Sequence, residues 1–252
     1  MAIKTRKISD WLSANGQAVT NASKATMEDA IRADIGQLYD GVFIVFHRKS
    51  DDFPLAVRVS SWASYQASGE IAEGVLLVEG GRHLVIAPTE ASSVKWSSKP
   101  ASSSDTSGSV QISGVNTTGD RITALNDFVG RANTTAIING STSSNVTNTE
   151  DYAAGFCNRY SRTNANGKGM TAGKWWLPSM GEMAIIWANF DKINYALSKI
   201  SGATLLQANW YWTSTQYSAT YAWSLFLSDG SMYYNFYKFS QGRVRPVSAF
   251  LN

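Results

Sequence analysis

The sequence has little of what most catalytic, metal-binding or disulfide-rich proteins use: 252 residues contain one cysteine and two histidines. The single cysteine, Cys157, excludes an intramolecular disulfide, so any role outside a cell has to depend on packing alone. Its neighbourhood, DYAAGFCNRY, has helical spacing, and we interpret Cys157 as a buried apolar residue. His47 and His83 have no partner at metal-ligand spacing, so we expect no metal centre and no cofactor.

The chain also lacks charge runs and long apolar runs. Its net charge is +3 with Lys and Arg scattered, so we do not expect it to bind nucleic acid. The start, MAIKTRKISDWLSANG, has basic residues without a following apolar run, which predicts no secretory signal, and no later segment predicts membrane insertion. We therefore expect a cytosolic product that reaches the outside, if at all, through virion assembly or specialised export.

A hydrophobic content of 44% is enough for a full core, but residues 1–36 look separate from the rest. The stretch SKATMEDAIRADIGQL places Met27, Ile31 and Ile35 at helical spacing. One short amphipathic helix cannot bury its own apolar stripe, so this helix packs either on the main domain, residues 37–252, or on copies of itself. We favour self-association or attachment as its role.

Strand patterns begin at Tyr39. They cover GVFIVF, LAVRVSSW and GVLLVEGGRHLVIA, the last with Gly80-Gly81 as a hairpin turn. Residues 97–119 are mostly Ser, Thr and Gly and predict a long exposed loop.

Two helices are predicted after this loop. The first spans about 149–162 with Thr149 as N-cap, and the second spans about 179–200, where Ser179 and Glu182 have capping-box spacing. Strand patterns then run from Trp210 to the end. The order strands, helices, strands predicts an α+β domain with an antiparallel sheet.

Five blocks carry a family resemblance: NTTAII (133–138), AAGFCNRY (153–160), WWLPSMGEM (175–183), YWTSTQYSATYAW (211–223) and RVRPVSAF (243–250). In this order and spacing they resemble the C-type-lectin-like domains of gut bacteria and their phages, including variable proteins of diversity-generating retroelements. The similarity covers residues 37–252. It implies a lectin-like fold whose last strands present a ligand-binding face, with a variable region at about 211–246.

In retroelement-diversified members, template adenines are copied with errors. Codons AAC and AAT can then encode most amino acids but never Lys, Glu, Gln, Met or Trp. Between Ser218 and Ser240, the residues outside that set are Trp223, Met232 and Lys238. The stretch is therefore compatible with such diversification, although the test is permissive.

Alternation in WSLFLSDGSMYYNFY gives an independent interpretation of the same stretch. It predicts Trp223, Leu225 and Leu227 toward the core and Ser224, Phe226 and Ser228 outward. With Asp229-Gly230 as a two-residue hairpin turn, Ser231, Tyr233 and Asn235 return on the outer side, and Met232, Tyr234 and Phe236 on the Trp223 side. Phe226 and Tyr233 would then form an exposed cross-strand pair. The alternative is that most of these rings fill the core of a barrel-like end.

An exposed cluster of aromatic residues suggests a contact surface. The candidate ligand-binding residues are Ser218, Thr220, Tyr221, Ser224, Phe226, Ser228, Asp229, Ser231, Tyr233, Tyr234, Asn235, Tyr237, Phe239 and Ser240. Flanking residues are predicted to be structural: Trp175, Trp176, Trp210 and Trp212 fill the core or support a sheet, and Arg243 and Arg245 pair with local carboxylates or carbonyls.

We therefore expect a binding protein rather than an enzyme. By resemblance, it is a phage tail-tip adhesin that assembles as a trimer and binds a protein or glycan receptor on a bacterial surface. The alternative is a bacterial surface adhesin or lectin-like domain with a fixed ligand. An enzyme would require a deep pocket that holds His47 or His83 with a carboxylate in reach.

Overall fold

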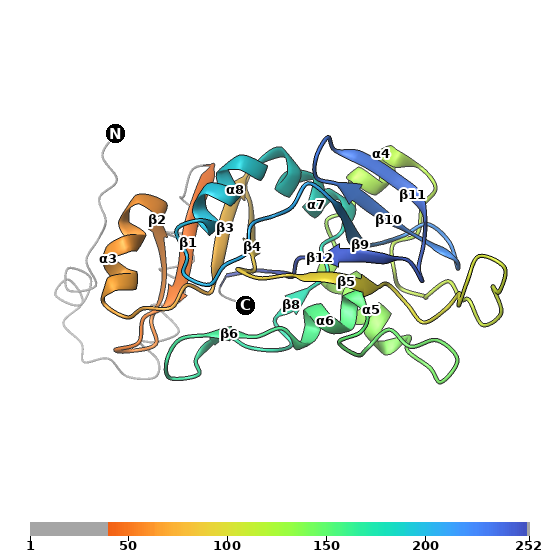
Figure 1. Cartoon of the computed structure of the whole chain (residues 1–252), viewed down its shortest axis with the longest axis horizontal. Coiled ribbons are helices and arrows are strands. Elements are labelled where there is room, and N and C mark those ends of the chain that lie inside the picture. Colours follow the sequence, from red (N-terminus) through yellow and green to blue (C-terminus); the bar gives the residue numbers. More distant parts are fainter. Residues whose placement is uncertain (1–39, 251–252) are drawn as a thin grey trace. The chain divides into compact units, whose positions relative to one another are not determined.

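The computed structural model describes residues 40–250, which belong to one compact unit. This part is α+β, with six α-helices and mostly antiparallel strands (Figure 1), which confirms the predicted fold class. The helix expected within residues 1–36 lies outside the described residues. Among residues 40–250, the structure contains no helix with the length and hydropathy needed to cross a bilayer.

Two sheets organise the unit. The six-stranded sheet has the order β2 (Pro54–Arg58), β1 (Gly41–His47), β3 (Gly74–Glu79), β4 (Arg82–Ile86), β13 (Val247–Ser248) and β8 (Trp175–Trp176). The five-stranded sheet has the order β11 (Ser231–Tyr237), β10 (Tyr221–Phe226), β9 (Trp210–Gln216), β12 (Gln241–Val244) and β5 (Ala91–Lys95). A small hairpin pairs β6 (Arg162–Thr163) with β7 (Gly169–Met170). All neighbours are antiparallel except β12 and β9, which are parallel.

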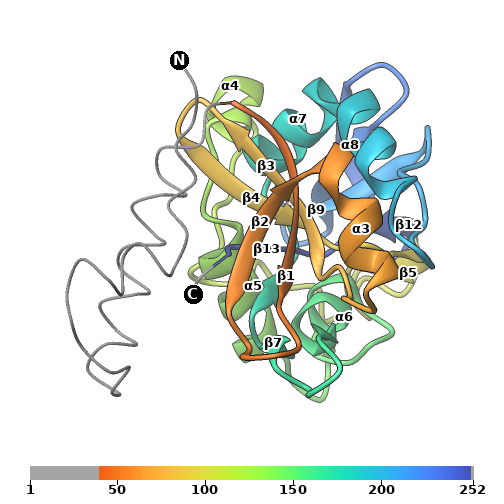
Figure 2. The same ribbon diagram turned by 90° about the vertical axis from the view of Figure 1, so that its left-hand side faces the viewer.

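The β3–β4 hairpin forms where the sequence predicts it, and β3 pairs with β1 in the same sheet (Figure 2). Gly80 and Gly81 have φ values of 54° and 78°, which glycine adopts without strain. The predicted strand LAVRVSSW ends earlier than expected, at Arg58. It continues as a 3-10 turn and then as α3 (Trp62–Ala67), whose Trp62 is buried under the sheet.

Two helices between the long loop and α6 were not predicted: α4 (Arg121–Leu125) and α5 (Gly130–Asn139). Asp120 caps α4 by accepting a hydrogen bond from the amide of Thr123 at 2.7 Å. The helix predicted at 149–162 is shorter, α6 (Ala153–Arg159), and its N-cap is Tyr152 rather than Thr149. Gly155 lies directly against the Thr149 backbone, so residues before Tyr152 form a turn that crosses the helix.

The last predicted helix is confirmed at its start and divided in its middle. Ser179 and Glu182 form the expected capping box at the start of α7 (Met180–Ala188). The chain then breaks at Asn189 and continues as α8 (Phe190–Leu197). The Asn189 amide donates to the carbonyl of Ile185 at 3.0 Å and to Glu79 at 3.2 Å, and such local side-chain bonds compete with helical ones.

Two apolar clusters fill the unit. The larger one packs the six-stranded sheet against α3, α7 and α8, and it includes Tyr211, Trp223 and Leu225 from the five-stranded sheet. The smaller cluster packs the opposite side of the five-stranded sheet, through Trp212, against α5 and α6. The five-stranded sheet is therefore covered on both sides at its centre, and its two edge strands, β11 and β5, are the parts without buried residues.

Candidate functional site

The candidate surface is the β10–β11 hairpin at the edge of the five-stranded sheet (Figure 1). Phe226 pairs with Ser231, so the loop between the strands has four residues, Leu227–Gly230, and the predicted two-residue turn is wrong. The pairing register differs from the predicted one by two residues. Because side chains alternate with a period of two, each residue near the turn still lies on the predicted side of the sheet. Trp223, Leu225 and Leu227 are buried as predicted.

A β-bulge changes the sides farther along β11. Ser224 pairs with Tyr233 but Ala222 pairs with Phe236, so β11 has one extra residue in this interval. Tyr234 lies on the Trp223 side as predicted, with ring centroids 5.8 Å apart. Phe236 lies on the other side, against Trp212 at 4.5 Å, so the predicted position of Phe236 is wrong.

One side of the hairpin carries the Trp210 cluster, which we define as Trp210, Phe226, Tyr233 and Phe236. Trp210 lies 4.9 Å from Phe226 and 5.4 Å from Tyr233 between ring centroids. The predicted direct pair of Phe226 and Tyr233 is therefore replaced by contacts through Trp210. Trp210 was expected to fill the core or to support a sheet; it is half-buried at the surface of the sheet, whereas Trp175, Trp176 and Trp212 are buried.

The other side carries the Tyr217 cluster, which we define as Tyr217, Tyr221, Tyr234, Tyr237 and Phe239. Tyr217 lies 5.0 Å from Tyr234, Tyr221 lies 4.6 Å from Tyr237, and Tyr237 lies 5.0 Å from Phe239. A hydrogen bond with Tyr237 raises the pKa of Tyr221. The hairpin thus presents aromatic side chains on both sides of its edge strand rather than on one flat face.

Most predicted site residues are accessible. Ser228, Asp229, Ser231, Tyr233 and Tyr234 are exposed, and Ser218, Thr220, Tyr221, Phe226, Asn235, Tyr237, Phe239 and Ser240 are half-buried. Ser224 is the correction: it is fully buried, and its hydroxyl has no hydrogen-bond partner among residues 40–250. Outward alternation does not expose Ser224 because Trp212 is its neighbour on β9 and Tyr233 its neighbour on β11.

The three residues that varied Asn codons cannot encode belong to the framework of the hairpin. Trp223 is fully buried and its indole donates to the Thr118 carbonyl at 2.8 Å. Met232 packs against the larger core cluster. Lys238 is fully buried at the end of β11. These positions therefore hold the hairpin in place instead of forming its surface.

Lys238 is buried without an acidic partner among the described residues. Its ammonium group donates to Oε1 of Gln216 at 2.5 Å and lies 4.4 Å from the ring centre of Trp96. Burial lowers the pKa of Lys238 to about 7. Its backbone carbonyl accepts from the amides of Trp96 and Ser97, which ties the start of the long loop to the hairpin.

The two arginines of the RVRP sequence, which follows the hairpin, belong to a buried ion network. Nη1 of Arg243 lies 2.7 Å from Glu90, Nη2 of Arg245 lies 2.8 Å from the same carboxylate, and the Tyr211 hydroxyl donates to it at 2.7 Å. Arg245 also donates to the Ala87 carbonyl at 3.0 Å. Both arginines are occupied by local partners, as the sequence predicts.

Other groups with chemical potential lie away from the hairpin. Cys157 is buried as predicted, and burial raises its thiol pKa well above the usual value. Nδ1 of His47 lies 2.8 Å from the buried carboxylate of Glu73. Within residues 40–250, no group of three His, Cys, Asp or Glu side chains is placed to hold a metal.

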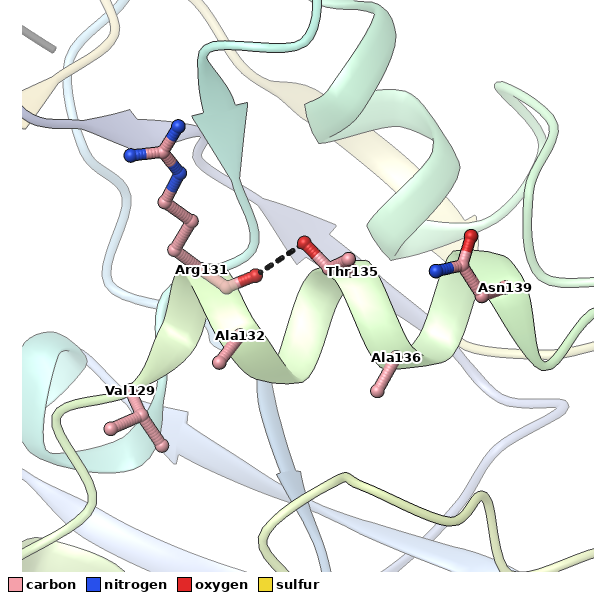
Figure 3. Close-up of a pocket in the computed structure, with 6 residues that line it drawn as sticks. All are labelled: Val129, Arg131, Ala132, Thr135, Ala136 and Asn139. Atoms are coloured by element: carbon pink, nitrogen blue, oxygen red, sulfur yellow. Dashed lines mark hydrogen bonds between the residues drawn. The ribbon is translucent and has the colours of Figure 1, made fainter.

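A shallow depression of about 680 Å³ lies along α5 (Figure 3). It is lined by Val129, Arg131, Ala132, Thr135, Ala136 and Asn139. The Thr135 hydroxyl donates to the Arg131 carbonyl at 3.0 Å, so it is engaged with its own helix. The lining offers one cation and one hydroxyl that is engaged with its own helix, and it contains no His, Cys, Asp or Glu.

Comparisons with known proteins identify the fold but no family. No family model and no curated protein matches the chain. A crystal structure of a fimbrial protein from Bacteroides ovatus is similar, with a TM-score of 0.51 and 16% sequence identity over 84% of this chain. The chain spans about half of that protein, since the match covers 49% of its length. At this identity the likeness concerns the fold alone.

Proposed function

We propose that the chain is a receptor-binding protein whose C-terminal surface is diversified by a retroelement, as the adhesin of a phage tail tip that determines host tropism. The observation that carries the proposal is that residues 218–240 divide into accessible surface residues and framework residues. Exposed and half-buried Tyr and Phe residues of this stretch belong to the Trp210 and Tyr217 clusters, and the residues between Ser218 and Ser240 that varied Asn codons exclude are framework residues. A non-enzymatic role is part of the proposal.

The aromatic clusters suit this role physically. Tyr and Trp offer large contact areas with few rotatable bonds, so a surface rich in them binds many partners without individual refinement. Tyr233 and Tyr234 are 41% and 39% exposed, on opposite sides of the same strand. A surface that is rewritten at random binds each receptor through few good contacts, in the micromolar range or weaker.

Weak single sites make assembly part of the proposal. Linking several copies on one particle raises avidity by about 10² to 10⁴ without new contacts. We propose a trimer gathered by the apolar stripe of Met27, Ile31 and Ile35. Light scattering on the full chain and on a chain that starts at Gly36 tests this step, and a monomeric full chain would contradict it.

The genome that encodes the chain tests diversification itself. An adenine-rich near-copy of codons 211–246 beside a reverse-transcriptase gene is expected. Its absence from the complete genome would reject diversification. The second candidate, a surface adhesin with a fixed ligand, would then be preferred, because the similar solved structure is a fimbrial protein.

A further inference from the structure

A second concave site lies where the α7–α8 corner meets the tip of the β10–β11 hairpin. Its volume is about 580 Å³, within the range of small-ligand sites. The lining residues are Trp187, Ala188, Asn189, Phe190, Asp191, Lys192, Ala208, Leu227 and Ser228. Apolar and polar groups are therefore both present in one cavity.

Trp187 is the aromatic wall of this cavity. Its side chain is 39% exposed, although Met183 and Ile186 of the same helix are fully buried. Gly230 packs directly on the indole: a Cβ there would lie 2.5 Å from Cζ2, and its φ of +78° also favours glycine. The hairpin tip thus supports the ring from one direction, and part of the ring remains open to the cavity.

The polar groups that line the cavity include both hydrogen-bond donors and hydrogen-bond acceptors. Asp191 is exposed and has no hydrogen bond or ion pair within the described part of the chain, which leaves its carboxylate free to accept. The ammonium group of Lys192 is positioned by a 3.0 Å hydrogen bond to Asn189 Oδ1. Ser228 adds an exposed hydroxyl from the hairpin. The two opposite charges favour a ligand without net charge.

We infer that this cavity binds one sugar ring of a surface glycan. A sugar has an apolar C–H face that stacks on an indole, and hydroxyl groups that donate and accept at once, which suits a lining with a carboxylate, an ammonium group and a hydroxyl. This inference goes beyond the proposed function, since Trp187, Asp191 and Lys192 lie outside residues 211–246. The contribution of these three residues persists when the hairpin surface changes, whereas that of Ser228, which lies within residues 211–246, changes with it.

The test is a titration of the ¹⁵N-labelled full chain, followed by the indole N–H signals in ¹H–¹⁵N spectra. The probes are the methyl glycosides of glucose, galactose, mannose and N-acetylglucosamine, each up to about 50 mM, because a single sugar on one aromatic wall is expected to bind in the millimolar range. At least one glycoside shifts the Trp187 signal, which is assigned by its loss in Trp187→Ala.

Variants distinguish this site from the hairpin surface. Binding to each variant is followed by saturation transfer to the glycoside signals, because Trp187→Ala has no Trp187 indole signal. Trp187→Ala and Asp191→Asn each weaken binding about tenfold. Tyr195→Ala, which removes a 58% exposed aromatic ring from α8 outside the cavity, leaves binding unchanged, and so does Tyr233→Ser. Thermal unfolding verifies that each variant folds. If Trp187→Ala does not fold, Asp191→Asn decides, because Asp191 is an exposed residue.

Three outcomes overturn the inference. The first is that none of the four glycosides shifts the Trp187 signal. The second is that binding persists undiminished in Asp191→Asn and in a folded Trp187→Ala. The third is that Tyr233→Ser abolishes binding while Trp187→Ala retains it, which would assign the sugar to the hairpin surface. None of these outcomes depends on whether the gene is diversified.

Discussion

Strands β9 and β11 lie in the same sheet, have seven residues each and are both rich in aromatic side chains, yet they differ in burial. In β9, WYWTSTQ, every residue after half-buried Trp210 is buried. In β11, SMYYNFY, no residue is buried. β9 lies between β10 and β12, whereas β11 is paired on one side only. Composition alone therefore does not separate framework from surface; the position in the sheet does.

The largest expected effect tests the framework at Trp223. Replacing Trp223 with Ala should lower the free energy of unfolding by about 3 to 5 kcal/mol, because a fully buried ring is lost and a cavity remains. Urea unfolding followed by circular dichroism measures it. A loss no larger than that of Tyr233→Ser would show that the assigned strand register is wrong.

A somewhat smaller effect tests the ion network below the hairpin. Arg245→Met should lower the free energy of unfolding by about 3 kcal/mol, since it removes one partner of a buried carboxylate. Arg243→Met is the matched control, and its partly exposed side chain predicts a smaller loss. Equal losses in the two variants would contradict the buried role of Arg245.

Lys238 is the framework residue whose replacement should stabilise the protein. Its depressed pKa means that the folded state binds this proton less tightly than the unfolded chain. The free energy of unfolding therefore rises with pH above about 7, by about 1 kcal/mol per unit up to pH 9, and this slope is absent below pH 7. Lys238→Met should raise stability at pH 7 and remove the slope.

The control for this pH dependence is Lys95→Met, which replaces an exposed lysine. Both variants are unfolded in urea between pH 6 and pH 9. If Lys238→Met retains the slope of the parent chain, another group causes it, and the account of Lys238 as a buried lysine with a lowered pKa fails.

The smallest expected effect is on the surface side of the comparison. Tyr233→Ser should lower the free energy of unfolding by no more than about 1 kcal/mol, because the residue is 41% exposed and loses only aromatic contacts with Trp210 and Phe236. Thermal unfolding beside Trp223→Ala measures it. A loss above 2 kcal/mol would place Tyr233 in the framework.

Local signals predicted much of the fold. The Gly80-Gly81 hairpin and the Ser179–Glu182 capping box depend on neighbouring residues, so the sequence reveals them directly. The α+β class follows from the order of such elements. The break at Asn189 was not predictable, because it depends on a hydrogen bond to Glu79, which is distant in sequence.

The sequence predicted which residues form the candidate surface better than it predicted how those residues are arranged. Alternation placed Trp223, Leu225 and Tyr233 on the correct sides near the turn. No residue pattern predicted the bulge that moves Phe236 to the side opposite Trp223. Trp210 was missed because tryptophan in a strand is usually core. Trp187 and the cavity beside it were missed because the helix α7 and the hairpin tip meet only in the folded chain.

The central claim is that the hairpin surface tolerates change while its framework does not. The most direct measurement is a library with every substitution from Ser218 to Ser240, displayed on yeast as the full chain, sorted for protease resistance and sequenced. Protease resistance reports the population of folded chains. The account predicts broad tolerance at Ser228, Ser231, Tyr233 and Tyr234, and strong depletion of substitutions at Trp223, Leu225 and Gly230. Depletion at Tyr233 and Tyr234 equal to that at Trp223 would contradict it.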